Sequence, residues 1–222
     1  MGNSKQVRSS LCCTHKHLLA VLVNRFVAVP LMKLYLVQHA ESKRKDEDPA
    51  RPLSEKGWKD IRKVAEYAEK CLHIQVEQIF HSDKLRAKQT AQALADHLHP
   101  KKGVQFAEGL NPLADPKDWE TLLAEATEDT LIVGHLPHLG KLAGQLLTGD
   151  DDGEVVAFRN GCIVCLEKNE GGQWTVQWMI TPETVPQNNG AALNFEATME
   201  SAREILEEAA AIAEKKIEGT LQ

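Results

Sequence analysis

Short apolar runs in this chain alternate with longer segments in which apolar residues recur every three or four positions. The runs have the length of buried β-strands and lie at 33–37, 78–80, 104–106 and 131–133. The longer segments predict helices that bury one face, and the first two are expected to begin at caps formed by Ser54 and Ser82. Their buried faces are expected to include Trp58, Ile61, Val64, Ala65, Ala68, Ala87, Ala91, Leu94 and Leu98.

The second half of the chain continues this alternation and then changes it. A helix is predicted from 118 to 126 and another near Pro137, whose fixed backbone suits a first helical turn. Two final apolar runs, 162–167 and 174–180, flank the turn-forming residues Asn169-Glu170-Gly171-Gly172 and predict a hairpin. The order of elements predicts an α/β fold: a three-layer sandwich in which a mostly parallel sheet has helices on both faces and an antiparallel edge.

The first 31 residues differ from the rest. An apolar run at 18–23 follows several basic residues, but it is too short to span a bilayer and is interrupted by Asn24 and Arg25. No convincing cleavage site follows it, and Gln6 stands where N-myristoylation at Gly2 would need Ser or Thr. We interpret 1–31 as an unstructured leader, or as sequence upstream of a true start at Met32, with a poor membrane-targeting signal as the alternative.

The alternating pattern itself predicts one domain, 32–182. A linker at 187–190 is followed by an acidic helical pattern from 196 to 218. We interpret 183–222 as a linker and an acidic helical tail that packs back on the domain or frays. A dimer contact through this tail is left open.

Composition narrows the class of protein. Of the 222 residues, 42% are hydrophobic and 26% are charged, which is typical of a globular domain and not of a membrane protein. The net charge of −6 argues against nucleic acid as a partner, because surfaces that bind it are usually basic. Five cysteines without a repeated spacing favour a reducing, cytoplasmic location. Cys162 and Cys165 form a lone C-x-x-C pair in an apolar run and are interpreted as strand residues, not as a zinc site.

Three predicted strands lead into residues that handle phosphate. His39 follows the first strand, Arg86 lies in the first helical turn after the second, and His135 follows the strand at 131–133. Because ligands collect beyond the carboxyl ends of the strands in such a sheet, these side chains are expected to converge. A neutral imidazole can attack phosphorus while cationic groups hold the oxygens, so this set predicts phosphoryl transfer with a histidine nucleophile.

Each of these residues also has a purely structural interpretation. A histidine just past a buried strand is often only a satisfied polar residue, which applies to His39 and to His135. Arg86 is one of several basic residues on a helix that also carries Lys84 and Lys88. The catalytic interpretation therefore rests on the combination of the three.

Nucleotide and metal sites are rejected. Five residues separate Gly134 from Gly140 where a Walker loop has four, and no hydroxyl residue follows Lys141. Two histidine pairs, His97-x-His99 and His135-x-x-His138, lack a third ligand placed by spacing. We expect no metal and no cofactor.

Four motifs between Met32 and Pro182 carry a family resemblance. They are the strand into His39, Arg51-Pro52-Leu53-Ser54-Glu55-Lys56-Gly57, Ser82-Asp83-Lys84-Leu85-Arg86-Ala87-Lys88-Gln89-Thr90, and Gly134-His135-Leu136-Pro137. In this order they resemble the histidine phosphatase superfamily, and most closely its small SixA-type phosphohistidine phosphatases. The resemblance implies a phosphoglycerate mutase-like fold.

The resemblance also implies a metal-independent reaction through a covalent phosphohistidine. By position, His39 would be the nucleophile, while Arg86 and His135 would hold the phosphoryl oxygens. The short form of the chain lacks the lid insertions of larger relatives, which implies an open site. The implied partner is a phosphorylated protein, such as a domain that carries phosphohistidine.

One departure from the family pattern bears on the rate. The pattern is Arg-His-Gly, whereas this chain has Gln38-His39-Ala40. Glutamine donates through its amide but loses a fixed charge and a bidentate grip. A charge-assisted hydrogen bond contributes about 1.5–3 kcal/mol, so about tenfold in rate or more would be lost. Arg51 is expected to bind substrate and to offset part of this loss. Glu108 lies where larger relatives place a general acid, but an exposed loop carboxylate is the simpler interpretation.

Three hypotheses follow from the sequence. The first is a cytoplasmic phosphatase that removes phosphoryl groups from histidine in proteins. The second is a phosphatase for small phosphate esters, which would need a lidded pocket and a positioned acid. The third is a phosphate-binding module with weakened catalysis, which Gln38 alone supports.

Overall fold

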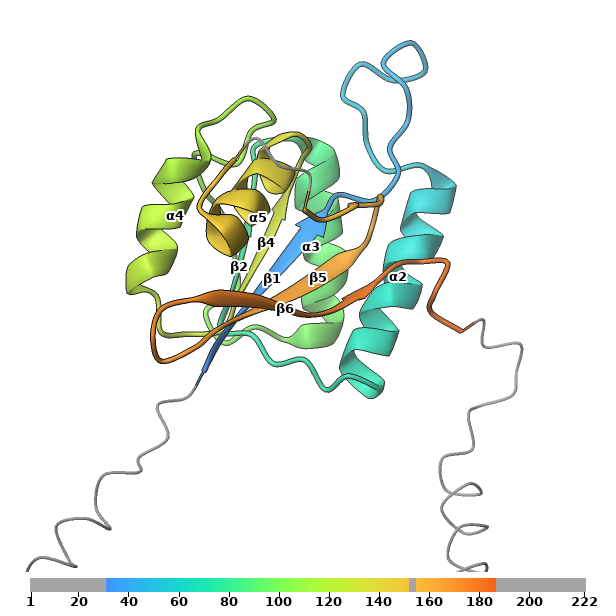
Figure 1. Cartoon of the computed structure of the whole chain (residues 1–222). Coiled ribbons are helices and arrows are strands. Elements are labelled where there is room, and N and C mark those ends of the chain that lie inside the picture. The colour runs from blue at the N-terminus through green and yellow to red at the C-terminus, as the bar shows by residue number, and fades with distance from the viewer. Residues whose placement is uncertain (1–30, 152–154, 187–222) are drawn as a thin grey trace, which may run out of the picture. The chain divides into compact units, whose positions relative to one another are not determined.

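The computed structural model describes residues 31–151 and 155–186, and the six strands of this part form one sheet (Figure 1). The strand order is β3-β2-β4-β1-β5-β6. Four strands are parallel: β1 (Met32–Gln38), β2 (Gln78–His81), β3 (Val104–Phe106) and β4 (Thr130–Gly134). The hairpin of β5 (Ile163–Lys168) and β6 (Trp174–Ile180) adds an antiparallel edge beside β1. The predicted mostly parallel sheet with an antiparallel edge is confirmed.

Two pairs of helices cover the sheet (Figure 1). α2 (Glu55–Lys70) packs against α3 (Leu85–Leu98) on one face, and α4 (Pro116–Glu125) packs against α5 (His138–Thr148) on the other. Successive strand residues point to opposite faces, so each buried strand supplies both layers of the core. The layer under α4 and α5 contains Leu34, Leu36, Ile132, Trp119, Leu123, Leu139 and Leu142.

The register of the parallel strands brings their carboxyl ends level with one another. Gln38 of β1 pairs with Gly134 of β4, and His81 of β2 pairs with Val133. The next residue of each strand therefore emerges at the same edge of the sheet. These residues are His39, Ser82 and His135.

The two predicted serine caps differ in outcome. Ser54 caps α2 as predicted, because its side chain accepts a hydrogen bond from the Gly57 N–H. The prediction for Ser82 is wrong: α3 begins at Leu85, and Lys84 occupies the N-cap position without a side-chain cap. The Ser82 hydroxyl instead lies 2.6 Å from His135 Nε2, so it serves the end of β4 and not the start of the helix.

The interpretations of the leader up to residue 30 and of the tail beyond residue 186 lie outside the described residues. A compact unit ends at Pro182, and the domain limits of 32 and 182 stay a prediction. Cys162 and Cys165 are buried free thiols, directly before β5 and within it. In the part of the chain that is described, every helix is too short or too polar to cross a bilayer.

Candidate active site

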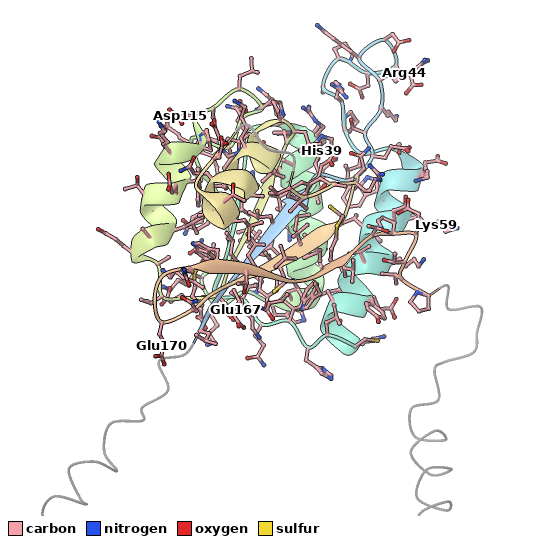
Figure 2. All side chains as sticks on the ribbon, viewed as in Figure 1. His39, Arg44, Lys59, Asp115, Glu167 and Glu170 are labelled. Atoms are coloured by element: carbon pink, nitrogen blue, oxygen red, sulfur yellow. The ribbon has the colours of Figure 1, made fainter. Side chains whose placement is uncertain are left out.

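His39 is held at the end of β1 by its own backbone and ring (Figure 2). Its N–H donates to the Gly134 carbonyl at 3.1 Å, which ties β1 to the end of β4. The ring nitrogen Nδ1 lies 2.7 Å from the Ala40 carbonyl oxygen. Because a carbonyl only accepts, Nδ1 carries the ring proton and Nε2 keeps a lone pair.

Arg86, in the first turn of α3, uses that lone pair. Its Nε–H donates to His39 Nε2 at 3.0 Å, a bond that only an unprotonated Nε2 can accept. Burial and then the charges of Arg86 and Arg51 lower the pKa of His39 to about 4, against the opposing hydrogen bond to Ala40. The imidazole is therefore neutral at pH 7, as a nucleophile requires. Burial and the charge of Arg51 also lower the pKa of Arg86.

Thr90, one turn further along α3, connects these two residues. Its hydroxyl donates to the Arg86 carbonyl at 2.8 Å and accepts from the Ala40 N–H at 3.0 Å. The hydroxyl is fully buried, so both bonds are protected from water. Thr90 thereby fixes the spacing between the end of β1 and the start of α3, a role that the sequence analysis missed.

His135 lies beside His39, with ring centroids 4.9 Å apart and the rings tilted by 58°. Its Nε2 lies 2.6 Å from the Ser82 hydroxyl, and its Nδ1 is buried without a hydrogen-bond partner among the described residues. Burial, then the proximity of His39 and Arg86, lowers the pKa of His135 to about 3. Three of the five candidate residues, His39, Arg86 and His135, thus meet at one edge of the sheet, and their catalytic roles stay a prediction.

Gln38 occupies the other side of His39 and is paired with a distant residue. Its Nε2 donates to Asn160 Oδ1 at 2.7 Å, while its Oε1 is buried without a partner in the described part of the chain. The backbone supports this pairing, because the Gly161 N–H donates to the Gln38 carbonyl at 2.9 Å. Gly161 has a φ of +74°, a conformation that other residues rarely adopt, and this turn presents Asn160.

Arg51 belongs to the loop between β1 and α2, which projects beyond the sheet and carries Arg44 (Figure 2). The Arg51 side chain donates to the Lys43 carbonyl and to the Ser42 hydroxyl, each at 3.3 Å. The positive charge of Arg51 contributes to lowering the pKa of His39 and that of Arg86. Arg51 therefore adds positive charge near the site while its guanidinium is bonded to its own loop.

Gly57, in the first turn of α2, fixes the base of this loop. A Cβ there would lie 2.0 Å from the Glu41 carbonyl oxygen, so only glycine permits this close approach. The Ser54 N–H donates to the same carbonyl at 3.0 Å. The conformation of the loop that carries Arg51 thus depends on the Arg51–Gly57 motif as a whole.

The profile of the histidine phosphatase superfamily (branch 1) matches residues 34–130, a span that contains His39, Arg51, Ser82 and Arg86. Over this span the chain is similar to the histidine phosphatase superfamily. The observed sheet and the similarity to solved structures with this fold confirm the predicted phosphoglycerate mutase-like fold.

The proteins that this chain resembles are phosphatases with different named substrates. Phosphohistidine phosphatase SixA of Escherichia coli (strain K12) is 25% identical over 156 residues, which cover 68% of this chain and 94% of SixA. The structure of SixA complexed with tungstate has a TM-score of 0.60 at 24% identity and covers 70% of this chain and all of that one. A putative α-ribazole-5′-P phosphatase from E. coli shares the fold, with a TM-score of 0.58, 15% identity, and coverage of 68% and 97%.

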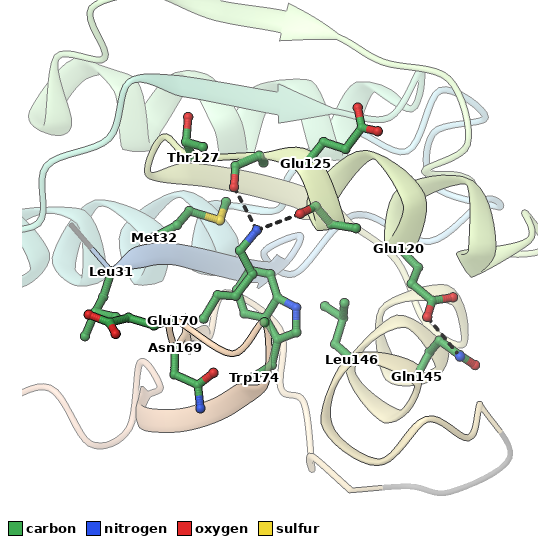
Figure 3. Close-up of a pocket in the computed structure, with 14 residues that line it drawn as sticks. Leu31, Met32, Glu120, Glu125, Thr127, Gln145, Leu146, Asn169, Glu170 and Trp174 are labelled. Atoms are coloured by element: carbon green, nitrogen blue, oxygen red, sulfur yellow. Dashed lines mark hydrogen bonds between the residues drawn. The ribbon is translucent and has the colours of Figure 1, made fainter. Parts of the chain in front are cut away.

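A cavity of about 600 Å³ has none of the candidate site residues in its lining (Figure 3). It is lined by Met32 and Trp174 at the starts of β1 and β6, at the edge of the sheet opposite His39. Its cationic side chain is already occupied: Lys168 Nζ donates to the carbonyls at the end of α4, namely those of Leu123, Ala124 and Ala126, at 2.8–3.0 Å. These bonds satisfy the free carbonyls of a helix terminus, so Lys168 has a structural role.

Two further expectations concern acids and metals. The Glu108 side chain is exposed, and it is the Glu108 backbone carbonyl that accepts the Trp119 Nε1–H at 3.0 Å. Within residues 31–151 and 155–186, no three His, Cys, Asp or Glu side chains are placed to hold a metal ion together. The two histidines at the end of α3 lie at the surface. His97 Nδ1 lies 2.9 Å from a carboxylate oxygen of Glu69, and His99 is exposed.

Proposed function

We propose that this protein is a phosphatase that hydrolyses phosphohistidine in proteins, with His39 as the nucleophile. The observation that carries the proposal is the pair of hydrogen bonds on the His39 ring. The Ala40 carbonyl holds the proton on Nδ1, and Arg86 marks Nε2 as the nitrogen with the lone pair. A histidine nucleophile needs this combination of one anchored and one available nitrogen.

The first step of the proposed reaction transfers the phosphoryl group to His39. Nε2 forms a bond to phosphorus while the bond from phosphorus to the substrate's imidazole nitrogen breaks. Arg86 turns its N–H groups to the phosphoryl oxygens, and His135 donates to another oxygen through Nδ1, which has no partner among the described residues. Gln38 and Arg51 are proposed to bind the substrate at the rim of the site.

The second step regenerates the enzyme. Water attacks phosphorus, the bond to His39 Nε2 breaks, and orthophosphate leaves with the protons of the water. The leaving group of the first step is an imidazole, which departs as a neutral molecule when solvent has protonated its other ring nitrogen. Phosphohistidine therefore demands less from a general acid than an alkyl phosphate does, which suits a site whose nearby candidate, Glu108, is exposed.

Other observations support a protein substrate in a reducing compartment. SixA, the curated relative at 25% identity, is named a phosphohistidine phosphatase. SixA forms a complex with tungstate, a tetrahedral oxyanion like phosphate, which supports oxyanion binding by this chain as well. A cytoplasmic location is part of the proposal, and the free thiols of Cys71, Cys162 and Cys165 agree with it.

Trapping the covalent intermediate tests this proposal. The protein, incubated with a radiolabelled phosphohistidine domain and quenched rapidly, should carry an acid-labile, base-stable phosphoryl group on His39. His39→Ala should abolish both this label and the release of phosphate. His97→Ala is the control, because His97 lies on the surface of α3 and bonds to Glu69. Label that persists in His39→Ala would refute the mechanism.

The same assay decides between substrates. A panel of sugar and nucleotide monophosphates should be hydrolysed at least tenfold more slowly than phosphohistidine, because no positioned acid assists their departure. Faster turnover of a small ester would favour the second hypothesis, a small-molecule phosphatase. Binding of tungstate without any turnover would favour the third, a weakened phosphate-binding module.

A further inference from the structure

Every polar atom of Ser82 takes part in a hydrogen bond. Its N–H donates to the Val133 carbonyl at 3.3 Å, and its carbonyl accepts from His81 Nδ1 at 2.7 Å. Its hydroxyl accepts from the Lys84 N–H at 3.4 Å and lies 2.6 Å from His135 Nε2. Ser82 is 1% exposed and His135 is 2% exposed, so water does not compete for these bonds.

The direction of the Ser82–His135 bond follows from the other partners. A serine hydroxyl has one proton to donate and two lone pairs to accept with. The Lys84 N–H occupies one lone pair, and within the described residues His135 Nε2 is the acceptor near the hydroxyl proton. If Nε2 carried a proton instead, the buried serine proton would have no acceptor here. The hydroxyl therefore donates to Nε2.

This direction decides which tautomer His135 adopts. A neutral imidazole has one proton, so a ring that accepts at Nε2 carries its proton on Nδ1. Nδ1 is the nitrogen that is buried without a partner among the described residues. A proton there attracts a phosphoryl oxygen, whereas a lone pair there would repel it.

We propose that Ser82 is a positioning residue that keeps the proton of His135 on Nδ1, the atom that donates to the phosphoryl group. This inference rests on the proposed function, in which His135 holds a phosphoryl oxygen. Ser82 itself does not touch the substrate. The backbone bonds to Val133, His81 and Lys84 give its hydroxyl the rigidity that this role requires.

The tautomer of His135 can be measured directly in ¹⁵N-histidine-labelled protein by NMR, without turnover. The wild-type ring should be neutral at pH 7 with its proton on Nδ1. Ser82→Ala should shift the population toward the Nε2–H form, weaken tungstate binding about tenfold, and lower kcat/KM by about tenfold. Ser82→Thr keeps a hydroxyl and should restore both the tautomer and the affinity. Ser54→Ala removes a hydroxyl that caps α2 and should leave the His135 resonances in place.

The outcomes separate this inference from the proposed function. A wild-type His135 with its proton on Nε2 would overturn the role of Ser82 even in an active phosphatase. An unchanged tautomer and tungstate affinity in Ser82→Ala would overturn it as well. The Nδ1–H tautomer in a protein without phosphatase activity would instead refute the proposed function and leave the role of Ser82 intact. The wild-type spectrum decides the matter even if a variant fails to fold.

Discussion

The two sides of His39 are built from different kinds of groups. On the side of α3 and β4, Arg86 supplies a fixed charge and bonds to His39 and Thr90, while Ser82 bonds to His135. On the side of the β5 turn, a neutral glutamine is paired with a neutral asparagine. The proposed nucleophile and the residues proposed to hold the phosphoryl group are therefore all in place, while the cationic character of the site is concentrated on one side. We expect the missing charge at position 38 to lower the rate of hydrolysis without changing the proposed mechanism.

We call the side of His39 with Arg86 and His135 the stronger side, and the side with Gln38 and Asn160 the weaker side. Removing the charge of Arg86 from the stronger side should have the largest effect on activity. Arg86→Ala deletes the donor to His39 Nε2 and the cation that we propose for the phosphoryl oxygens. We expect kcat/KM to fall by about a hundredfold or more, the effect of losing one charge-stabilising donor. Arg86→Lys should recover only part of the activity, because an ammonium lacks the planar fork of the guanidinium.

Steady-state kinetics on a phosphohistidine domain checks this prediction. Lys88→Ala is the matched control, since Lys88 is exposed on the same helix. Equal losses in Lys88→Ala and Arg86→Ala would mean that α3 contributes only a general positive field. The comparison between the two sides would then lose its basis.

The stronger side should also make the fold sensitive to acid. Burial lowers the pKa of His135 to about 3 and that of His138 to about 4, whereas an unfolded histidine titrates near 6.5. The unfolded chain therefore binds more protons between about pH 6.5 and pH 4, and stability falls as the pH drops through this range. Each group contributes roughly 1 kcal/mol for each pH unit below its unfolded pKa.

Urea unfolding at pH 7 and at pH 5 measures this loss. His138 is fully buried, and neither ring nitrogen has a partner in the described part of the chain. His138→Leu should reduce the pH dependence by roughly a third, because His39, His135 and His138 share it. A stability that is the same at pH 7 and pH 5 would contradict the prediction.

The sequence predicted the stronger side better than the weaker one. Periodicity and buried runs located the strands before His39 and His135, and the common edge of parallel strands brings such residues together. Gln38 and Asn160 are 122 positions apart, and Asn160 lies in the turn before β5. No local sequence pattern indicates that these two residues pair. Ser82 was predicted as a helix cap, because a serine before a helix usually serves that purpose. Its bond to His135 depends on the register of β2 against β4, which the sequence does not display.

Strengthening the weaker side should have the smallest effect, and its sign is opposite. Asn160 Oδ1 accepts one N–H of Gln38 and would accept one N–H of an arginine equally well. The remaining N–H groups of the guanidinium would then be available to a phosphoryl oxygen. We expect Gln38→Arg to raise kcat/KM by up to about tenfold, the value of one charge-assisted hydrogen bond.

Gln38→Lys separates the charge from the geometry of the fork. It should give an intermediate gain if the charge matters and no gain if bidentate contact is required. The gain of Gln38→Arg should shrink in Asn160→Ala, because the exposed Asn160 is what orients the side chain at position 38. An unchanged rate in Gln38→Arg, together with intact tungstate binding, would mean that charge on this side does not limit the reaction. The neutral pair of Gln38 and Asn160 would then favour the third hypothesis, a phosphate-binding module with weakened catalysis.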